Sequence, residues 1–183
     1  PFITGTGDAA LPIHSDGELP PPRVGPEYSG IALGNDGEPV CVDASMQMTS
    51  ADVKAALMRL MPLIKERLHY LTDAAEMVRF LFTEPAVPPV EEIVPKKLDE
   101  AKTKEILLRA KNFVDAAFAM SHEEAENLAR TEAEALGVKL GDFMMPVRMA
   151  VTGSRISPPL IGSILILGKE RCLARIEKTL EKF

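Results

Sequence analysis

The chain is poor in the features that extracellular and membrane-spanning proteins need. Its two cysteines, Cys41 and Cys172, exclude a framework of several disulfides and lack the close spacing of metal ligands. No apolar run reaches the roughly 20 residues that a bilayer-spanning helix requires, and the first residues lack the basic segment that opens a signal peptide. We therefore expect a reducing, cytoplasmic setting and no membrane partner. Because the chain opens at Pro1 rather than Met, we also expect a fragment or a processed product.

The sequence also lacks the motifs of nucleotide and metal chemistry. It contains neither a P-loop nor the glycine-rich fingerprint of dinucleotide-binding domains. Its three histidines, His14, His69 and His122, have no catalytic partner at a recognisable spacing. We therefore expect no catalytic residue, no metal ion and no cofactor in this chain.

Charge is unevenly distributed along the chain. Residues 1–45 hold seven acidic residues and one basic residue, which accounts for the whole net charge of −6. Residues 143–183 hold seven basic and three acidic residues. A basic C-terminal end can bind an anionic partner even when the whole chain is acidic.

The apolar pattern predicts an all-α fold with two helical subdomains. Residues 1–45 contain seven prolines and seven glycines and are expected to form a loop-rich leader, in which a short hairpin around Asn35–Gly37 is an alternative. Helical periodicity then indicates a first subdomain at 46–84, a connector at 85–100 and a second subdomain at 101–183. Ser50 is expected to cap the first helix, Pro62 to begin a second, and Ser121 with Glu124 to form a capping box.

One stretch, FMMPVRMAVTGSRISPPLIG at 143–162, places two arginines in an apolar run. We expect one helix to end at Gly153 and another, capped by Ser157, to begin after it. The free N–H groups of a helix start favour anions, and Arg148 and Arg155 can stack on RNA bases and bond their edges. The alternative is a plain helix stop and start with solvated arginines.

Two stretches resemble a known family. PVRMAVTGSRISPPLIGSILILGKERCLARIEKTL is similar to the C-terminal signature of bacterial-type glutamyl-tRNA synthetases, in which an R-x-A-(L/V)-T-G segment precedes S/T-P, Leu and L-L-G-K-E-R. LMPLIKERLHYLTDAAEMVRFLF resembles an earlier helix of the same family. The resemblance covers residues 46–183. It implies a class I synthetase that attaches glutamate to its tRNA with ATP and magnesium, on a Rossmann domain whose HIGH-like and KMSKS-like motifs are missing here. This chain then corresponds to the anticodon-binding region, an α-helical cage of two subdomains.

The resemblance also implies roles for particular residues. Arg67 matches the arginine that reads the third anticodon base and separates glutamate tRNA from glutamine tRNA. Arg148 matches a second arginine at the anticodon. Ser157 takes the place of a hydroxyl residue that hydrogen-bonds there, while Leu160 and Pro159 would pack against the bases. The implied partners are the anticodon stem-loop of tRNA(Glu) and the remainder of the synthetase, and no DNA.

Other basic residues are less specific. Arg155, Lys169 and Arg171 are expected to contact the RNA backbone. Together with Arg175, Lys178 and Lys182, the residues Lys169 and Arg171 form either a phosphate-facing side or only a solvated face. A second hypothesis for the whole chain is a stand-alone helical module that binds RNA or protein, with the acidic leader folded over the basic end.

Overall fold

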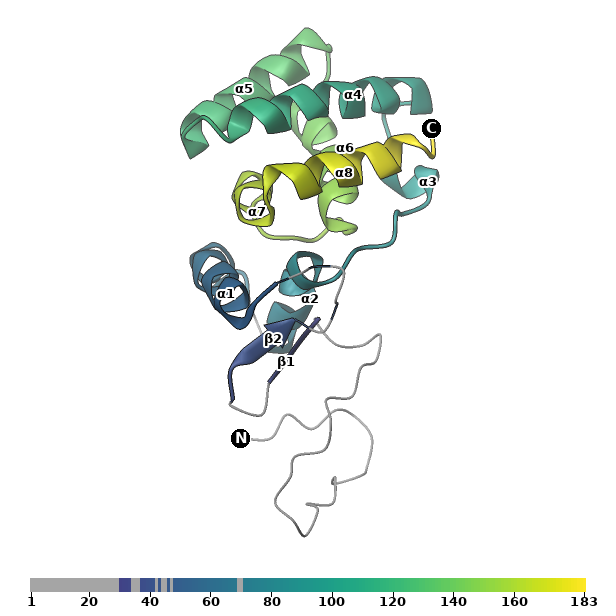
Figure 1. The fold of residues 1–183 in the computed structure, drawn as a ribbon. Helices are drawn as coiled ribbons and strands as arrows, with labels where there is room; N and C mark the ends of the chain where they lie inside the picture. Colours follow the sequence, from purple (N-terminus) through teal and green to yellow (C-terminus); the bar gives the residue numbers. More distant parts are fainter. Residues whose placement is uncertain (1–29, 34–36, 42, 44–45, 47, 69–70) are drawn as a thin grey trace.

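The computed structural model describes residues 30–33, 37–41, 43, 46, 48–68 and 71–183, and these residues form mainly helices (Figure 1). The first part of the acidic leader, 1–29, lies outside the described residues, as do Asn35, Asp36 and two of the three histidines, His14 and His69. The predicted all-α class is confirmed. The elements are β1 (Ile31–Leu33), β2 (Pro39–Cys41), α1 (Ser50–Ile64), α2 (Leu71–Phe82), α3 (Val90–Ile93), α4 (Glu100–Ala117), α5 (His122–Ala135), α6 (Leu140–Thr152), α7 (Leu160–Leu167) and α8 (Lys169–Leu180).

A short antiparallel hairpin precedes the helices, which confirms that alternative for the leader. β1 pairs with β2 so that Ile31 lies opposite Cys41. The Cys41 thiol donates a hydrogen bond to the Phe82 carbonyl at 3.3 Å, which holds the hairpin against the end of α2. Gly30 has φ 78°, and a Cβ there would lie 2.6 Å from the Phe82 carbonyl oxygen. A larger residue would therefore push the hairpin away from α2.

Local signals explain several helix ends. Ser121 and Glu124 form the predicted capping box at the start of α5, and Gly153, with φ 68°, ends α6 as predicted. The predicted cap of α1 is wrong by one residue, because Thr49 accepts the capping bond and forms a capping box with Asp52. Thr49 and Ser50 both carry a hydroxyl that can cap a helix, but only Thr49 has an acidic residue three positions later.

The prediction that Pro62 begins a second helix is wrong. Pro62 does not begin a new helix, because α1 continues through it to Ile64. A proline in the last turn removes a single backbone hydrogen bond, and packing of the helix outweighs that loss. The connector at 85–100 also contains a single helical turn, α3, whose Ile93 is fully buried.

The core of the second group of helices is built around α4. Its predicted apolar stripe is buried, and Phe113 meets Phe143 of α6 edge-to-face, with ring centroids 5.9 Å apart. In Figure 1, α4 to α8 lie together at one end of the molecule, and α1, α2 and the hairpin lie at the other. None of the described helices is long and apolar enough to cross a membrane.

Candidate nucleic-acid interface

The C-terminal end of α1 packs against the start of α7. Gly162 allows this approach, because a Cβ there would lie 2.5 Å from Cδ1 of Leu63. At the far end of the same contact, Nη2 of Arg59 donates to the carbonyl oxygen of Leu165 at 3.3 Å. The two helices therefore run antiparallel. The turn that follows α1 and carries Arg67 is thus placed next to the loop that precedes α7.

Arg148 extends from α6 to this loop and is held there by one nitrogen. Its Nη1 donates to the hydroxyl of Ser157, to the carbonyl of Pro158 at 3.0 Å and to the carbonyl of Ser157 at 3.3 Å. Ser157 is 5% exposed, and its hydroxyl donates in turn to the Pro158 carbonyl at 3.1 Å. Nε and Nη2 of Arg148 have no hydrogen-bond partner within the described part of the chain. Two donors of a partly exposed guanidinium are therefore available to a ligand.

Arg67 and Arg148 form a pair of like charges. Arg67 is exposed immediately after α1, where its backbone N–H donates to the Ile64 carbonyl at 2.8 Å. Burial lowers the pKa of Arg148, and the positive charge of Arg67 lowers it further. Neither side chain forms an ion pair with a carboxylate among the described residues. Arginine side chains are cations, so this surface attracts anions.

The loop between α6 and α7 is held at several points and exposes one large apolar side chain. Nη2 of Arg155 donates to the Glu92 carbonyl at 2.8 Å, which fixes the loop against α3. The N–H of Ile156 donates to the Ser154 hydroxyl at 3.2 Å. The side chain of Ile156 is 76% exposed, although its backbone is held in the loop. Ile156 is absent from the site residues predicted from the sequence. Its place in a predicted loop, between an arginine and a serine, could have indicated an exposed apolar side chain.

The start of α7 differs from the prediction that Ser157 caps it. The helix begins at Leu160, with Pro159 in the N-cap position and no side-chain cap. Pro159 disfavours helical geometry for Pro158, so the helix begins only after both prolines, and the Ser157 hydroxyl faces Arg148 instead. Leu160 is 3% exposed and supports the loop from the core side. Pro159 is partly exposed and, with Ile156, offers apolar surface.

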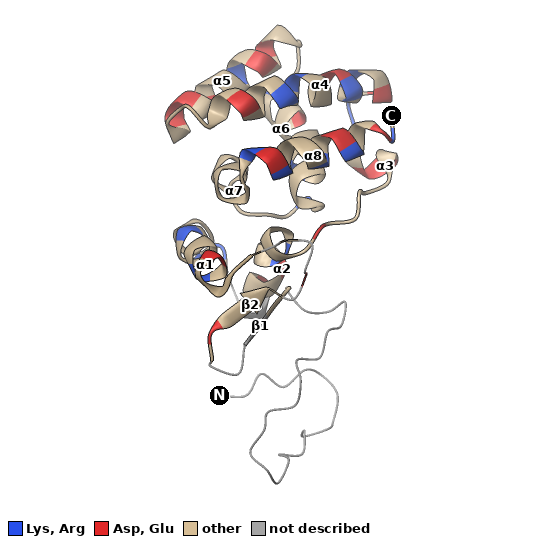
Figure 2. Cartoon of the chain, viewed as in Figure 1, with Lys and Arg blue, Asp and Glu red and all other residues tan. Residues whose placement is uncertain are grey.

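Two of the residues predicted to contact the RNA backbone lie elsewhere. Lys169 forms an ion pair with Asp115, and Nη2 of Arg171 donates to the Met46 carbonyl. They lie beyond the far end of α7, about 12 Å along its axis from its start, and help to line a cavity of about 570 Å³ beside α1. Figure 2 shows acidic and basic positions interspersed along the ribbon of α8. The described residues contain no group of three His, Cys, Asp or Glu side chains that could hold a metal ion.

Comparison with known proteins places this surface in a family. Residues 40–180 match the anticodon binding domain family, and the chain belongs to that family. It is an anticodon-binding domain homologous to the C-terminal part of glutamate–tRNA ligases, which confirms the resemblance seen in the sequence. The family match begins inside the segment that the sequence assigns to the leader, and it includes most of β2.

The similar proteins are considerably longer than this chain. The chain is 57% identical over 131 residues to the glutamate–tRNA ligase of Treponema denticola, and 49% identical over 129 residues to that of Treponema pallidum. These alignments cover 71% and 70% of this chain but 26% and 24% of the relatives, so the chain spans about a quarter of their length. A crystal structure of a glutamate tRNA ligase from Elizabethkingia meningosepticum, in complex with its amino acid, superposes with a TM-score of 0.45 at 21% identity, covering 75% of this chain and 30% of that one.

Proposed function

We propose that this chain reads the anticodon of a glutamate tRNA as one part of a glutamate–tRNA ligase. The observation that carries the proposal is the guanidinium of Arg148, whose Nη1 is fixed by the loop while Nε and Nη2 have no partner among the described residues. Arg67 adds a second cation without a carboxylate partner beside it. Such a surface suits an unstacked base that is joined to a phosphate backbone.

The chemistry of recognition follows from the guanidinium groups. An arginine can donate two parallel hydrogen bonds to a base edge that presents two acceptors, such as O2 and N3 of cytosine. An analogue without those acceptors leaves buried donors unpaired, which costs about 1–3 kcal/mol for each group. In line with the family resemblance, we assign the third anticodon base to Arg67 and another anticodon base to Arg148. This assignment favours glutamate tRNA over glutamine tRNA.

The apolar part of the site is assigned to Ile156 and Pro159. Both precede α7. Ile156 is largely exposed and lies in the chain between Arg155 and Ser157, which make the polar contacts of the loop. A splayed base can rest its face on such side chains while its edge bonds to arginine. Ser157 then orients Arg148, and Leu160 supports the loop from within the core. Arg155 belongs to the same loop, and the exposed part of its side chain can contact a phosphate.

The ligase activity itself belongs to the remainder of the parent protein. We propose that the parent joins glutamate to its tRNA in the cytoplasm with ATP and magnesium, and that this chain contributes recognition without a catalytic residue or cofactor of its own. The proposal that the chain is a separate RNA- or protein-binding module depends on the acidic leader. Most of that leader lies outside the described residues, so the alternative rests on sequence alone.

The test is binding of the 183-residue chain to an anticodon stem-loop of glutamate tRNA, beside the same stem-loop with each anticodon base changed in turn. Measurements at two salt concentrations separate phosphate contacts, which weaken with salt for every sequence, from base contacts. We expect tighter binding of the cognate stem-loop at both salt concentrations. Equal binding of all stem-loops, with a shared salt dependence, would show that this surface holds RNA without reading it.

A further inference from the structure

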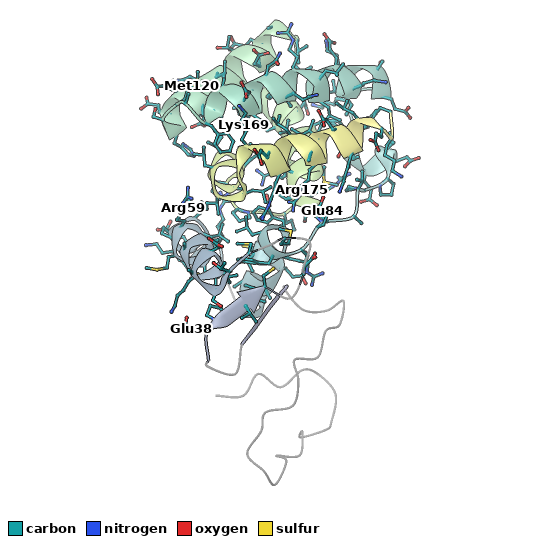
Figure 3. The ribbon with its side chains drawn as sticks, in the orientation of Figure 1. Glu38, Arg59, Glu84, Met120, Lys169 and Arg175 are labelled. Carbon is teal, nitrogen blue, oxygen red and sulfur yellow. The ribbon has the colours of Figure 1, made fainter. Side chains whose placement is uncertain are left out.

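Arg175 on α8 is almost completely buried, with 2% of its surface exposed. The sequence suggested a phosphate-facing or solvated residue, and both interpretations are wrong. Its Nη1 donates to the Val151 carbonyl at 2.7 Å, its Nε to Oε2 of Glu84 at 3.2 Å and its Nη2 to the Thr83 carbonyl at 3.3 Å. Figure 3 shows Arg175 and Glu84 next to each other between the two groups of helices. One guanidinium thus uses all three of its nitrogens within the protein.

The acceptors of Arg175 belong to both groups of helices. Thr83 and Glu84 directly follow α2, which is packed against α1 in the first group. Val151 lies on α6 in the second group, three residues after Arg148. Arg175 therefore ties the exit of the group that carries Arg67 to the helix that carries Arg148.

Neighbouring contacts hold the same junction in place. The N–H of Glu84 donates to Oδ2 of Asp43 at 3.2 Å, and its second carboxylate oxygen accepts from Lys178 at 3.0 Å. Pro85, the next residue, packs so closely on the end of α6 that a Cβ on Gly153 would lie 2.7 Å from its Cβ. The chain is therefore held tightly where it passes from one group to the other.

A buried arginine suits the task of fixing an orientation. Apolar contacts between helices tolerate small slides, whereas a planar guanidinium satisfies three acceptors in only one arrangement. Buried ion pairs add little net stability compared with apolar side chains, and in some proteins they serve to specify one arrangement. Burial lowers the pKa of Arg175, and the charge of Glu84 and its hydrogen bond oppose that shift, so the cation stays in place at neutral pH.

We propose that Arg175 is a positioning residue for anticodon recognition, which sets the position of Arg67 relative to Arg148 by tying the end of α2 to α6. This inference rests on the proposed function of the Arg67–Arg148 surface. Lysine is a poor substitute, because one ammonium group cannot meet three acceptors spread around a plane.

The experiment is a double-mutant cycle between Arg175→Gln and Arg67→Gln. Binding of the cognate stem-loop and of one with a changed third anticodon base is measured well below the unfolding temperature, and the ratio of the two affinities is the cognate preference. Helical content is followed by circular dichroism. We expect Arg175→Gln to keep its helical content and to lose about tenfold of the cognate preference, the size of one misplaced charged hydrogen bond. In the Arg67→Gln background the same change should cause no further loss, because both act through one contact. Arg175→Lys should show an intermediate loss.

Lys178→Gln is the matched control. It removes a partner of the same Glu84 carboxylate, but the Lys178 side chain is 55% exposed and, among the described residues, hydrogen-bonds neither to α6 nor to the Thr83 carbonyl. We expect a change in preference below about twofold, as for an exposed ion pair. If Arg175→Gln loses its helical content, Glu84→Gln takes its place in the cycle, and the same non-additive loss is expected.

The outcomes distinguish the inference from the proposal on which it rests. If wild type prefers the cognate stem-loop and the losses from Arg175→Gln and Arg67→Gln simply add, Arg175 has a general structural role and the inference is wrong. Unchanged preference in a folded Arg175→Gln chain also overturns it. If wild type shows no preference at all, the proposed function has failed, and the positioning role fails with it.

Discussion

Ser157 accepts a hydrogen bond from Nη1 of Arg148, nine residues earlier in the chain, and donates one to the carbonyl of Pro158. A buried hydroxyl that is already used in both directions is poorly placed to read a base itself. Its effect is to orient the arginine, and the remaining edge of the guanidinium is then available to a ligand. The loop and the arginine thus act as one unit.

Ser157→Ala should weaken binding of the cognate stem-loop without unfolding the chain. Arg148 keeps its bonds to two carbonyls, so the expected loss is one net hydrogen bond, about 1 kcal/mol or roughly fivefold in affinity. Ser157→Thr should retain most of the affinity because it keeps the hydroxyl. Ser163→Ala is the control, since Ser163 is equally buried on α7 but bonds the Pro159 carbonyl rather than Arg148. Equal losses for the two alanine variants would argue against an orienting role for Ser157.

Ile156→Ala should lower RNA affinity and leave stability unchanged. The side chain is 76% exposed, so its truncation removes almost no core contact. The loss of one apolar platform for a base is expected to cost about 1 kcal/mol, and Ile156→Phe should strengthen binding through better stacking. Leu108 on α4 is another exposed apolar residue, with 52% of its surface exposed, and Leu108→Ala supplies the comparison. Affinity that is indifferent to both changes at Ile156 would remove this residue from the site.

The capping box of α5 predicts a pH dependence. Hydrogen bonds from Ser121 hold the pKa of Glu124 below its usual value, so this contribution to stability is present above the ordinary carboxyl pKa and is lost as the pH falls through the lowered one. Ser121→Ala should reduce the Tm at pH 7 by about 2–4 °C. The difference from wild type should narrow in melts at increasingly acid pH, as Glu124 becomes protonated. A difference that is constant with pH would show that the carboxylate contributes nothing to the cap.

The parts of the fold that follow local rules could be predicted from the sequence. Ser121 and Glu124 have the spacing of a capping box, and Gly153 adopts the left-handed conformation that ends a helix. The apolar stripe of α4 has helical spacing wherever it is placed. Each of these depends on residues within one turn of the chain, so neighbouring sequence carries the information.

The details of the site depend on contacts across the molecule. Ser157 has the right composition for a helix cap, but the two prolines that follow delay the helix and Arg148 takes the hydroxyl. Arg175 cannot be told from a solvated arginine in the sequence, because its burial comes from α6 and from the residues after α2. Ile156 is exposed in a loop whose hydrogen bonds run to α3 and within the loop itself. The residue types could be predicted, whereas their partners could not.

The most direct measurement is the cognate preference of Arg67→Gln and Arg148→Ala, taken with the Tm of Arg67→Gln. Removing the Arg67 cation relieves its repulsion of Arg148, so the Tm of Arg67→Gln should stay equal to that of wild type or rise. We expect both variants nevertheless to lose at least about tenfold of the preference for the cognate anticodon at either salt concentration. A full preference in both variants, or binding that depends on salt alone, would contradict it and leave the two arginines as solvated surface.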